Sequence, residues 1–362
     1  MAKIRVVKTS GTPFEMGYQH GMAHREDIIR YTKERVHIVC GGLWSGHQLE
    51  PEEVIALADR CIPDHNAYAP DLMDELRGMS KATGLSLGEL IIVGGFTDFV
   101  DTVYSEYRKQ QEPVLERLPI DDCTAFIVPD SAADSAGFFG QTWDMHDTAT
   151  EFVILLEVDT PEQPKSLVFT TTGCIGQIGM NEHGVCIGIN NLMATDGQIG
   201  VTWPFVVRKA LQQDNADDAL KCITEAKLAG AHNYLIFDKH GKGYNVEAMS
   251  SRCEITPLDE TPISHTNHCL LPQTLEFAQE RPEASQLSSE NRLSMANELL
   301  EKRPLSIDDL IAVTREPSAI CTRSKPPFHV ESCGAAIMQP KAGKFWAVWG
   351  LPDENEYEEF SI

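Results

Sequence analysis

The stretch Asp121–Pro129 reads DDCTAFIVP, an acidic, turn-prone pair followed by a cysteine and a run of apolar, β-branched and aromatic residues. Such a run predicts a strand that begins at Cys123. A second strand-like run, GQTWD, covers residues 140–144 and ends in the carboxylate of Asp144. A thiol at the start of one strand and a carboxylate at the end of the next indicate a nucleophilic site. In that chemistry the cysteine cuts the peptide bond before it, and the freed α-amino group then activates the thiol.

A cysteine at a newly formed N-terminus carries its own general base. A thiol attacks carbonyls as the thiolate, and the pKa of an ordinary cysteine is about 8.5. The pKa of an α-amino group is about 7.7–8.0, close to neutral pH, where a general base is most effective. However, any one of the ten cysteines taken alone is more often a small buried apolar residue. Residue types by themselves therefore leave both interpretations of Cys123 open.

The two motifs together resemble the acyl-coenzyme A:6-aminopenicillanic acid acyltransferase family (peptidase family C45) of autoproteolytic N-terminal-nucleophile (Ntn) hydrolases. The choloylglycine and penicillin V acylases are more distant relatives. A further resemblance is EMGYQHG at residues 15–21, which is similar to the family's E-x-G-x-x-x-G motif. Without the resemblance, Gly17 and Gly21 indicate close packing of a helix. The resemblance extends from Gly11 to the last hairpin and implies an α+β fold, the four-layer αββα sandwich with two antiparallel sheets.

The resemblance implies how the precursor is divided. The bond between Asp122 and Cys123 would be the autocleavage site, with Cys123 as nucleophile and new N-terminus. Residues 1–122 would form an α chain and residues 123–362 a β chain, which together make one Ntn hydrolase domain. Asp144 would lie beside the α-amino group; without the pairing it is more simply a capping or turn residue.

Three further site residues follow from the resemblance. Asn267, in the sequence HTNH, would donate its side-chain amide to the oxyanion of the tetrahedral intermediate. Such a preorganised donor typically lowers the barrier by about 2.7–4 kcal/mol. Asn191, at the end of a predicted hairpin, would donate its backbone N–H to the same oxyanion. Arg323, in the sequence ICTR, would lie near the substrate.

One departure concerns the residue before the cleaved bond. The fungal acyltransferase has Gly there, whereas this chain has Asp122, preceded by Asp121. Gly relieves steric strain in an N-to-S acyl shift, and Asp does not. Two carboxylates could instead polarise the thiol or the bond, or they could slow processing. The residue before the cleaved bond therefore differs from the fungal acyltransferase, whereas the nucleophile matches the family motif.

The rest of the chain changes from helical to strand-rich at Cys123. Before it, we expect a first strand at residues 4–8, a helix from Pro13, helices over 25–100 and an exposed connector over 105–120. After it, we expect strands at 151–158, 165–172, 233–238, 243–249 and 253–255, hairpins at 177–190 and 335–349, and helices at 203–213, 216–229, 288–302 and 306–313.

Composition excludes several classes of function. The net charge of −24 disfavours nucleic acids and anionic membranes as partners, because phosphate binding needs clustered Lys and Arg. No apolar run approaches the ~18 residues of a membrane span, and the first residues lack the apolar segment of a secretory signal. Ten cysteines without CxxC pairs fit a reducing compartment, so we expect a cytoplasmic protein. The acidic run at 353–359 is typical of a solvated surface.

We expect neither a metal nor an organic cofactor. HExxH, CxxC and GxSxG motifs are absent, and the glycines at 173, 176 and 179 do not have dinucleotide-binding spacing. His265 and His268 are only a weak metal signal. The substrate would be a small amide, with water preferred over an amine as acyl acceptor, and a homo-oligomer is compatible with the sequence. The alternative is a catalytically silent, unprocessed Ntn-fold protein that binds a small molecule.

Overall fold

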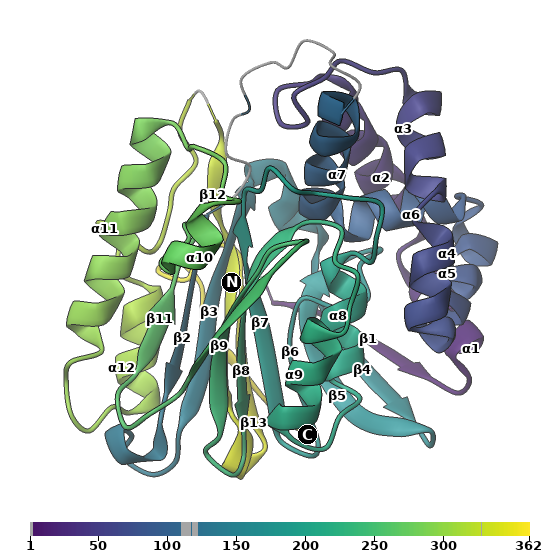
Figure 1. Cartoon of the computed structure of the whole chain (residues 1–362). Helices are drawn as coiled ribbons and strands as arrows, with labels where there is room; N and C mark the ends of the chain where they lie inside the picture. The colour runs from purple at the N-terminus through teal and green to yellow at the C-terminus, as the bar shows by residue number, and fades with distance from the viewer. Residues whose placement is uncertain (1–2, 110–116, 118–121, 327) are drawn as a thin grey trace.

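The computed structural model describes residues 3–109, 117, 122–326 and 328–362. They form four layers, in which two β-sheets lie face to face and helices cover the outer face of each sheet (Figure 1). The αββα sandwich implied by the resemblance is therefore confirmed.

The larger sheet has eight strands, and one pair in it differs from expectation. Neighbouring strands are antiparallel except for β1 and β4, which are parallel. The expectation of a fully antiparallel sheet is therefore wrong. The chain between β1 and β4 runs through seven described helices and through β2 and β3 of the other sheet, and this long connection permits a parallel pair. The strand order is β1 (Arg5–Ser10), β4 (Val153–Thr160), β5 (Gln163–Thr171), β6 (Ile178–Asn181), β7 (Val185–Leu192), β8 (Ala231–Asp238), β9 (Gly243–Ala248) and β10 (Cys253–Pro257).

The smaller sheet has six strands and contains the predicted nucleophile. The acidic run near the C-terminus ends in its edge strand β14, whose side chains remain partly exposed. The strand order is β11 (Ile263–His265), β2 (Asp122–Val128), β3 (Phe138–His146), β12 (Val330–Gln339), β13 (Lys344–Trp349) and β14 (Glu358–Ser361).

Strand β2 has two different faces. Cys123, Ala125 and Ile127 belong to the main core between the sheets, whereas Phe126 and Val128 pack in a second core under the helices of the smaller sheet. This alternation follows from the two-residue period of a strand. It places the Cys123 side chain in the space between the two sheets.

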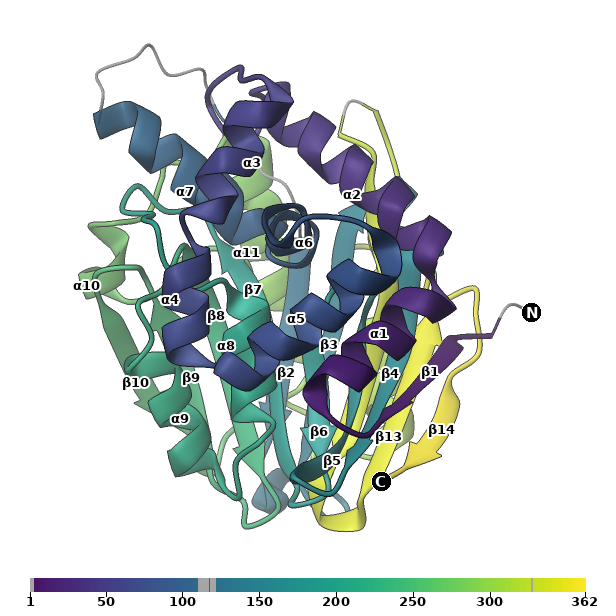
Figure 2. The ribbon, with the colours of Figure 1, turned by 90° about the vertical axis from the view of Figure 1, so that its right-hand side faces the viewer.

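The first helices cover the larger sheet, as the view in Figure 2 shows. Helix α1 begins with a capping box between Thr12 and Glu15 and has Pro in its first turn. A Cβ on Gly17 would lie 1.7 Å from the Glu75 carbonyl oxygen, so this glycine allows close contact with α5. The helices are α1 (Pro13–Ala23), α2 (Arg25–Cys40), α3 (Pro51–Asp59), α4 (Ile62–Tyr68), α5 (Pro70–Thr83), α6 (Leu87–Gly94) and α7 (Phe96–Lys109), with α8 (Trp203–Ala210) and α9 (Ala216–Thr224) on the same layer.

The fourth layer is formed by α11 (Glu283–Leu299) and α12 (Ile307–Thr314), and a short helix, α10 (Pro272–Leu275), precedes them. Helix α11 begins earlier than the predicted residue 288. Its first turns read EASQLSSEN and contain few apolar residues, so they carry no helical periodicity.

The expectation of an exposed connector over 105–120 is wrong at Ser105 and Arg117, although Arg108 and Lys109 are exposed. Helix α7 continues to Lys109 with Ser105 buried, and Arg117 is buried as well. The other positions, including Asp121, lie outside the described residues. Among the described helices, none has the length and apolar character needed to cross a membrane.

Candidate active site at the start of strand β2

Cys123 is buried at the start of β2, and its backbone is held on both sides. Its N–H donates to Asn267 Oδ1 at 2.6 Å, and its carbonyl oxygen accepts from Arg292 Nη1 at 2.5 Å. The peptide bond between Asp122 and Cys123 is therefore fixed relative to groups that come from much later in the chain.

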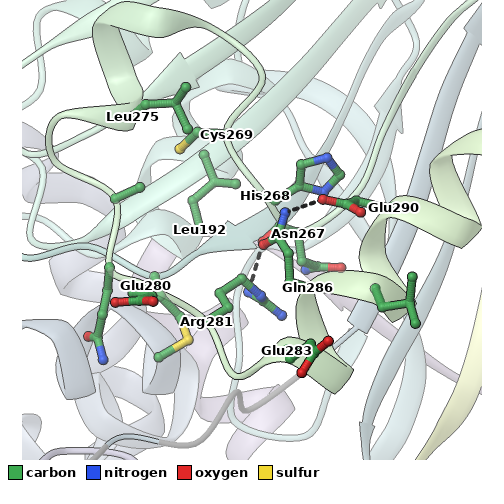
Figure 3. A pocket seen from close by; sticks show the side chains of 14 residues that line it. Leu192, Asn267, His268, Cys269, Leu275, Glu280, Arg281, Glu283, Gln286 and Glu290 are labelled. Atoms are coloured by element: carbon green, nitrogen blue, oxygen red, sulfur yellow. Dashed lines mark hydrogen bonds between the residues drawn. The ribbon is translucent and has the colours of Figure 1, made fainter.

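Asn267 follows strand β11 and is brought to Cys123, as the resemblance implies. Its backbone N–H donates to Ser289 Oγ at 2.9 Å, and its carbonyl accepts from Arg281 Nη1 at 2.8 Å (Figure 3). Its side-chain Nδ2 donates to the carbonyl oxygen of Asn191 at 3.2 Å. Asn191 therefore lies at the site and contacts Asn267 through its carbonyl oxygen, and the role of its N–H stays a prediction.

Asp144 lies one strand away from the predicted cleavage site. In the β2–β3 pair, Asp144 is directly opposite Asp122, and Trp143 is opposite Cys123. Residues opposite each other share a face of the sheet, so Asp144 is on the same side as Asp122. Its carboxylate is buried and accepts from Ser332 Oγ at 2.6 Å.

Two buried arginines that the sequence did not point to complete the site. Arg292 Nη2 lies 2.7 Å from Asp122 Oδ1 and 3.0 Å from Asn267 Oδ1. Arg281 Nη2 lies 3.9 Å from the same Asp122 oxygen, and Ser288 Oγ donates to Asp122 Oδ2 at 3.3 Å. The Asp122 carboxylate is therefore held by two cations and a hydroxyl.

One sequence signal could have found the helical part of this cluster. Ser285, Ser288 and Arg292 are spaced three and four apart, so they lie on one face of α11. Read together, they form a polar stripe on a helix that must cover a sheet. Arginine is almost never fully buried unless it is paired, so such a stripe indicates a buried partner carboxylate.

Two pockets flank the segment that carries these arginines. The larger, of about 640 Å³, is lined by Asn267 and Arg281 together with three glutamates, Glu280, Glu283 and Glu290 (Figure 3). The smaller, of about 390 Å³, is lined among others by Asp122, Ser285, Ser288, Arg323 and Lys325. One pocket is therefore acidic and the other is basic.

Arg323 lies on the wall of the basic pocket, and its guanidinium is already engaged. Its Nη2 lies 2.6 Å from Asp353 and its Nη1 2.5 Å from Glu354. The side chain is 43% exposed. The structure thus places Arg323 near Asp122, and its contact with a substrate stays a prediction.

A second carboxylate supports Asn267 from the other side. Glu247, on β9, is buried and lies 3.1 Å from Nε2 of His265. It also accepts from the backbone N–H groups of Leu270 and Leu271, at 2.6 and 3.3 Å, and from the hydroxyl of Thr274. Burial raises the pKa of Glu247, but the contacts with His265, Thr274 and Leu270 lower it overall. The ionised Glu247 thus ties down the segment after Asn267.

His265 and His268, the weak metal candidates, each contact protein groups. His265 pairs with Glu247, and His268 Nδ1 lies 2.7 Å from Ser289 Oγ. Burial lowers the pKa of His268 to about 4, so its imidazole is neutral at pH 7. Both histidines therefore act as hydrogen-bonding supports around Asn267.

Arg117 anchors the chain ahead of the predicted cleavage site. Its guanidinium lies 2.5 Å from Asp101 and donates to the carbonyl oxygen of Trp44 at 2.6 Å and to Gln279 Oε1 at 2.8 Å. Both charged partners are buried. A buried ion pair between α7 and Arg117 thus fixes the chain five residues before Asp122.

The sequence matches the family described as acyl-coenzyme A:6-aminopenicillanic acid acyl-transferase over residues 131–354, more than half of the chain. It is 25% identical over 270 residues to the 40 kDa form of acyl-coenzyme A:6-aminopenicillanic-acid-acyltransferase from Emericella nidulans, covering 73% of this chain and 69% of that protein. It is 24% identical to an uncharacterized protein of Archaeoglobus fulgidus, covering 64% of this chain but only 41% of that relative.

Two solved structures are similar at low sequence identity. A mutant conjugated bile acid hydrolase from Clostridium perfringens has a TM-score of 0.45 at 11% identity, covering 66% of this chain and 97% of that one. Penicillin V acylase from Agrobacterium tumefaciens has a TM-score of 0.34 at 11% identity, covering 67% and 79%. Because both TM-scores are below 0.5, the fold assignment rests on the layers and strand order described above.

Proposed function

Because the chain belongs to the acyl-coenzyme A:6-aminopenicillanic acid acyl-transferase family, we propose that it is the precursor of a cysteine amidohydrolase or acyltransferase that cleaves itself between Asp122 and Cys123. One observation carries the proposal: the N–H of Cys123 donates to Asn267 at 2.6 Å, while Asp144 lies directly opposite Asp122. The nitrogen that cleavage would release is thus already held by the residue expected to serve the reaction.

Self-cleavage would proceed by an N-to-S acyl shift. Cys123 Sγ bonds to the carbonyl carbon of Asp122 as the bond from that carbon to the Cys123 nitrogen breaks, and the thiol proton goes to the nitrogen. Water then attacks the thioester, which gives the Asp122 carboxyl group and the free thiol. Asn267 Oδ1, which now accepts the peptide N–H, would accept from the new α-amine and orient its lone pair toward Sγ.

Turnover would repeat the same steps on a small amide. The Cys123 thiolate attacks the amide carbonyl, the amine leaves with a proton, and the acyl-thioester passes to water or to another amine. An oxyanion donor from Asn267 requires Nδ2 to exchange its bond to the Asn191 carbonyl for the substrate oxygen. We prefer water as the acceptor.

The two chains would stay together after cleavage. Strand β1 of the proposed α chain pairs with β4 of the proposed β chain over six register positions from Arg5 to Ser10, and α1–α7 cover the larger sheet. Separation would expose that core to water. We propose the cytoplasm as the compartment: all ten cysteines lie within the described residues and none is in a disulfide, which fits a reducing environment.

Intact-mass spectrometry of the denatured protein tests this proposal. We expect two fragments that meet between Asp122 and Cys123 in the wild type, and one uncut chain in Cys123→Ala. Cys222→Ala, which changes a buried cysteine of α9, is the control and should be cut normally. A single uncut wild-type chain would contradict self-processing and favour a silent binding protein.

A further inference from the structure

The self-cleavage reaction has a substrate that the structure displays, the Asp122–Cys123 peptide. In this reaction the acyl group is that of Asp122, and its side-chain carboxylate lies 2.7 Å from Arg292 and 3.9 Å from Arg281. The precursor therefore shows how one acyl group with a carboxylate is held beside the nucleophile.

The cationic site is built from parts that cleavage does not remove. Arg292 also donates to the Cys123 carbonyl, and Arg281 donates to the Asn267 carbonyl and to Ser285 Oγ, each at 2.8 Å. The two side chains are only 1% and 4% exposed. Removing a carboxylate from a buried guanidinium is costly, so the site favours an anion once Asp122 becomes a chain end.

We propose that, in the cleaved enzyme, Arg281 and Arg292 bind a carboxylate on the acyl part of the substrate, an inference that rests on the proposed function. Two carbons, Cα and Cβ, separate the scissile carbonyl of Asp122 from its carboxylate. An external amide must place its carbonyl where that of Asp122 lies, because the same Sγ attacks both. The preferred acyl group is therefore a four-carbon, succinyl-type group with the same spacing.

The surroundings of Asp122 support an anionic ligand. Asp122 lines the pocket of about 390 Å³, whose wall also includes Ser285, Ser288 and Lys325. Arg323, on the same wall, is paired with Asp353 and Glu354. A carboxylate that replaces Asp122 can therefore keep the Ser288 hydrogen bond and the contact with Arg292. Bidentate or charge-assisted contacts of this kind are stronger than neutral hydrogen bonds.

The test uses the cleaved protein with matched ligands. Calorimetry compares succinate with butyramide, which has the same number of carbons and no carboxylate that could bind the two arginines. Kinetic assays compare two amide substrates, N-succinyl-4-nitroaniline and N-butyryl-4-nitroaniline. We expect succinate to bind at least about tenfold more tightly and kcat/KM to favour the succinyl amide by about 10- to 100-fold, the range of a charged hydrogen bond.

Variants of one cation link this preference to the site. Arg281→Gln should lose most of the preference, and Arg281→Lys should keep an intermediate part of it. Arg60→Gln, which removes a surface cation paired with Glu106, should keep the full preference. Circular dichroism and fragment masses identify the variants that fold and are cut.

Each outcome has a separate meaning. A cleaved protein that binds butyramide as tightly as succinate, or whose preference for succinate survives Arg281→Gln, overturns this inference and leaves the proposed function intact. A wild-type chain that stays uncut overturns the proposed function, and this inference with it. A cut protein that hydrolyses neither anilide is judged by the succinate binding alone.

Discussion

Asn267 lies between two carboxylates that are held in contrasting ways. On one side Glu247 binds His265, Thr274 and two backbone N–H groups, all from one continuous stretch of the chain. On the other side Asp122, the last residue of the proposed α chain, binds Arg281 and Arg292 of the proposed β chain. The same chemical group thus serves as a permanent support in one region and as an exchangeable occupant in the other.

The largest effect should come from Arg292→Ala in the uncut Cys123→Ala background. This change removes the closer of the two cations at Asp122 and the cation that contacts Asn267 Oδ1. Breaking a buried pair costs about 3–5 kcal/mol. Because Asp122 is 19% exposed, we expect a loss of about 3 kcal/mol in the free energy of unfolding, measured with urea. The control is Arg30→Ala, which removes a surface ion pair with Glu151 and should lower the free energy of unfolding by only about 0–1 kcal/mol. A loss no larger than the control's would show that Asp122 is not bound as described.

Glu247→Gln should have the next largest effect. It should lower the free energy of unfolding by about 2 kcal/mol, because several buried donors lose a charged acceptor. Since the folded pKa of Glu247 is lowered, its contribution is present above the unfolded value of 4.5 and is lost as pH falls through the folded value. Urea unfolding at pH 7 measures the loss, which should be equal in the uncut and cut proteins. A loss confined to one form would contradict a permanent support.

Ser289→Ala should cost about 1 kcal/mol and slow self-cleavage. Its Oγ accepts from the backbone of Asn267 at 2.9 Å and donates to the Thr266 hydroxyl at 3.0 Å. The loss of these bonds leaves the turn less firmly held. Unfolding gives the stability, and a time course of fragment masses gives the rate. Ser318→Ala, at an exposed turn, should cleave as the wild type does. Cleavage of Ser289→Ala at the wild-type rate would show that the Ser289 contacts with this turn do not contribute to self-cleavage.

A further effect depends on pH and is absent at neutral pH. Burial lowers the pKa of His268 from 6.5 to about 4. As pH falls, this histidine is therefore protonated in the unfolded chain at a higher pH than in the folded protein. The contribution of His268 is full above pH 6.5 and is lost as pH falls toward 4. In His268→Gln the urea midpoint should therefore change less between pH 6.5 and 4 than in the wild type. Identical slopes would mean that His268 is accessible to protons in the folded protein.

Local patterns were enough to predict most elements of the fold. The β-branched and aromatic run after Cys123 predicts β2, and Pro13 predicts the start of α1. The pairing of β1 with β4 could not be read from local pattern, because both directions of pairing use the same alternation. The buried state of Arg117 depends on Asp101, which lies on a different element.

The site was predictable only where a motif carries it. Cys123 and Asn267 are brought together as the family motifs imply. The role of Arg292 depends on Asp122, 170 positions away in the chain. The stripe of Ser285, Ser288 and Arg292 indicates a buried partner for this arginine, but only the folded sheet identifies that partner as Asp122.

The buried anchor at Arg117 has a consequence for the cut protein. Five residues span at most about 18 Å, so the end of the shorter chain cannot diffuse far from the site it occupied. It would act as a tethered competitor whose local concentration does not change when the protein is diluted. Inhibition by this tail would therefore be intramolecular and independent of protein concentration, and dialysis would not remove it. Shortening the chain between Arg117 and Asp122, rather than lowering the protein concentration, would relieve this inhibition.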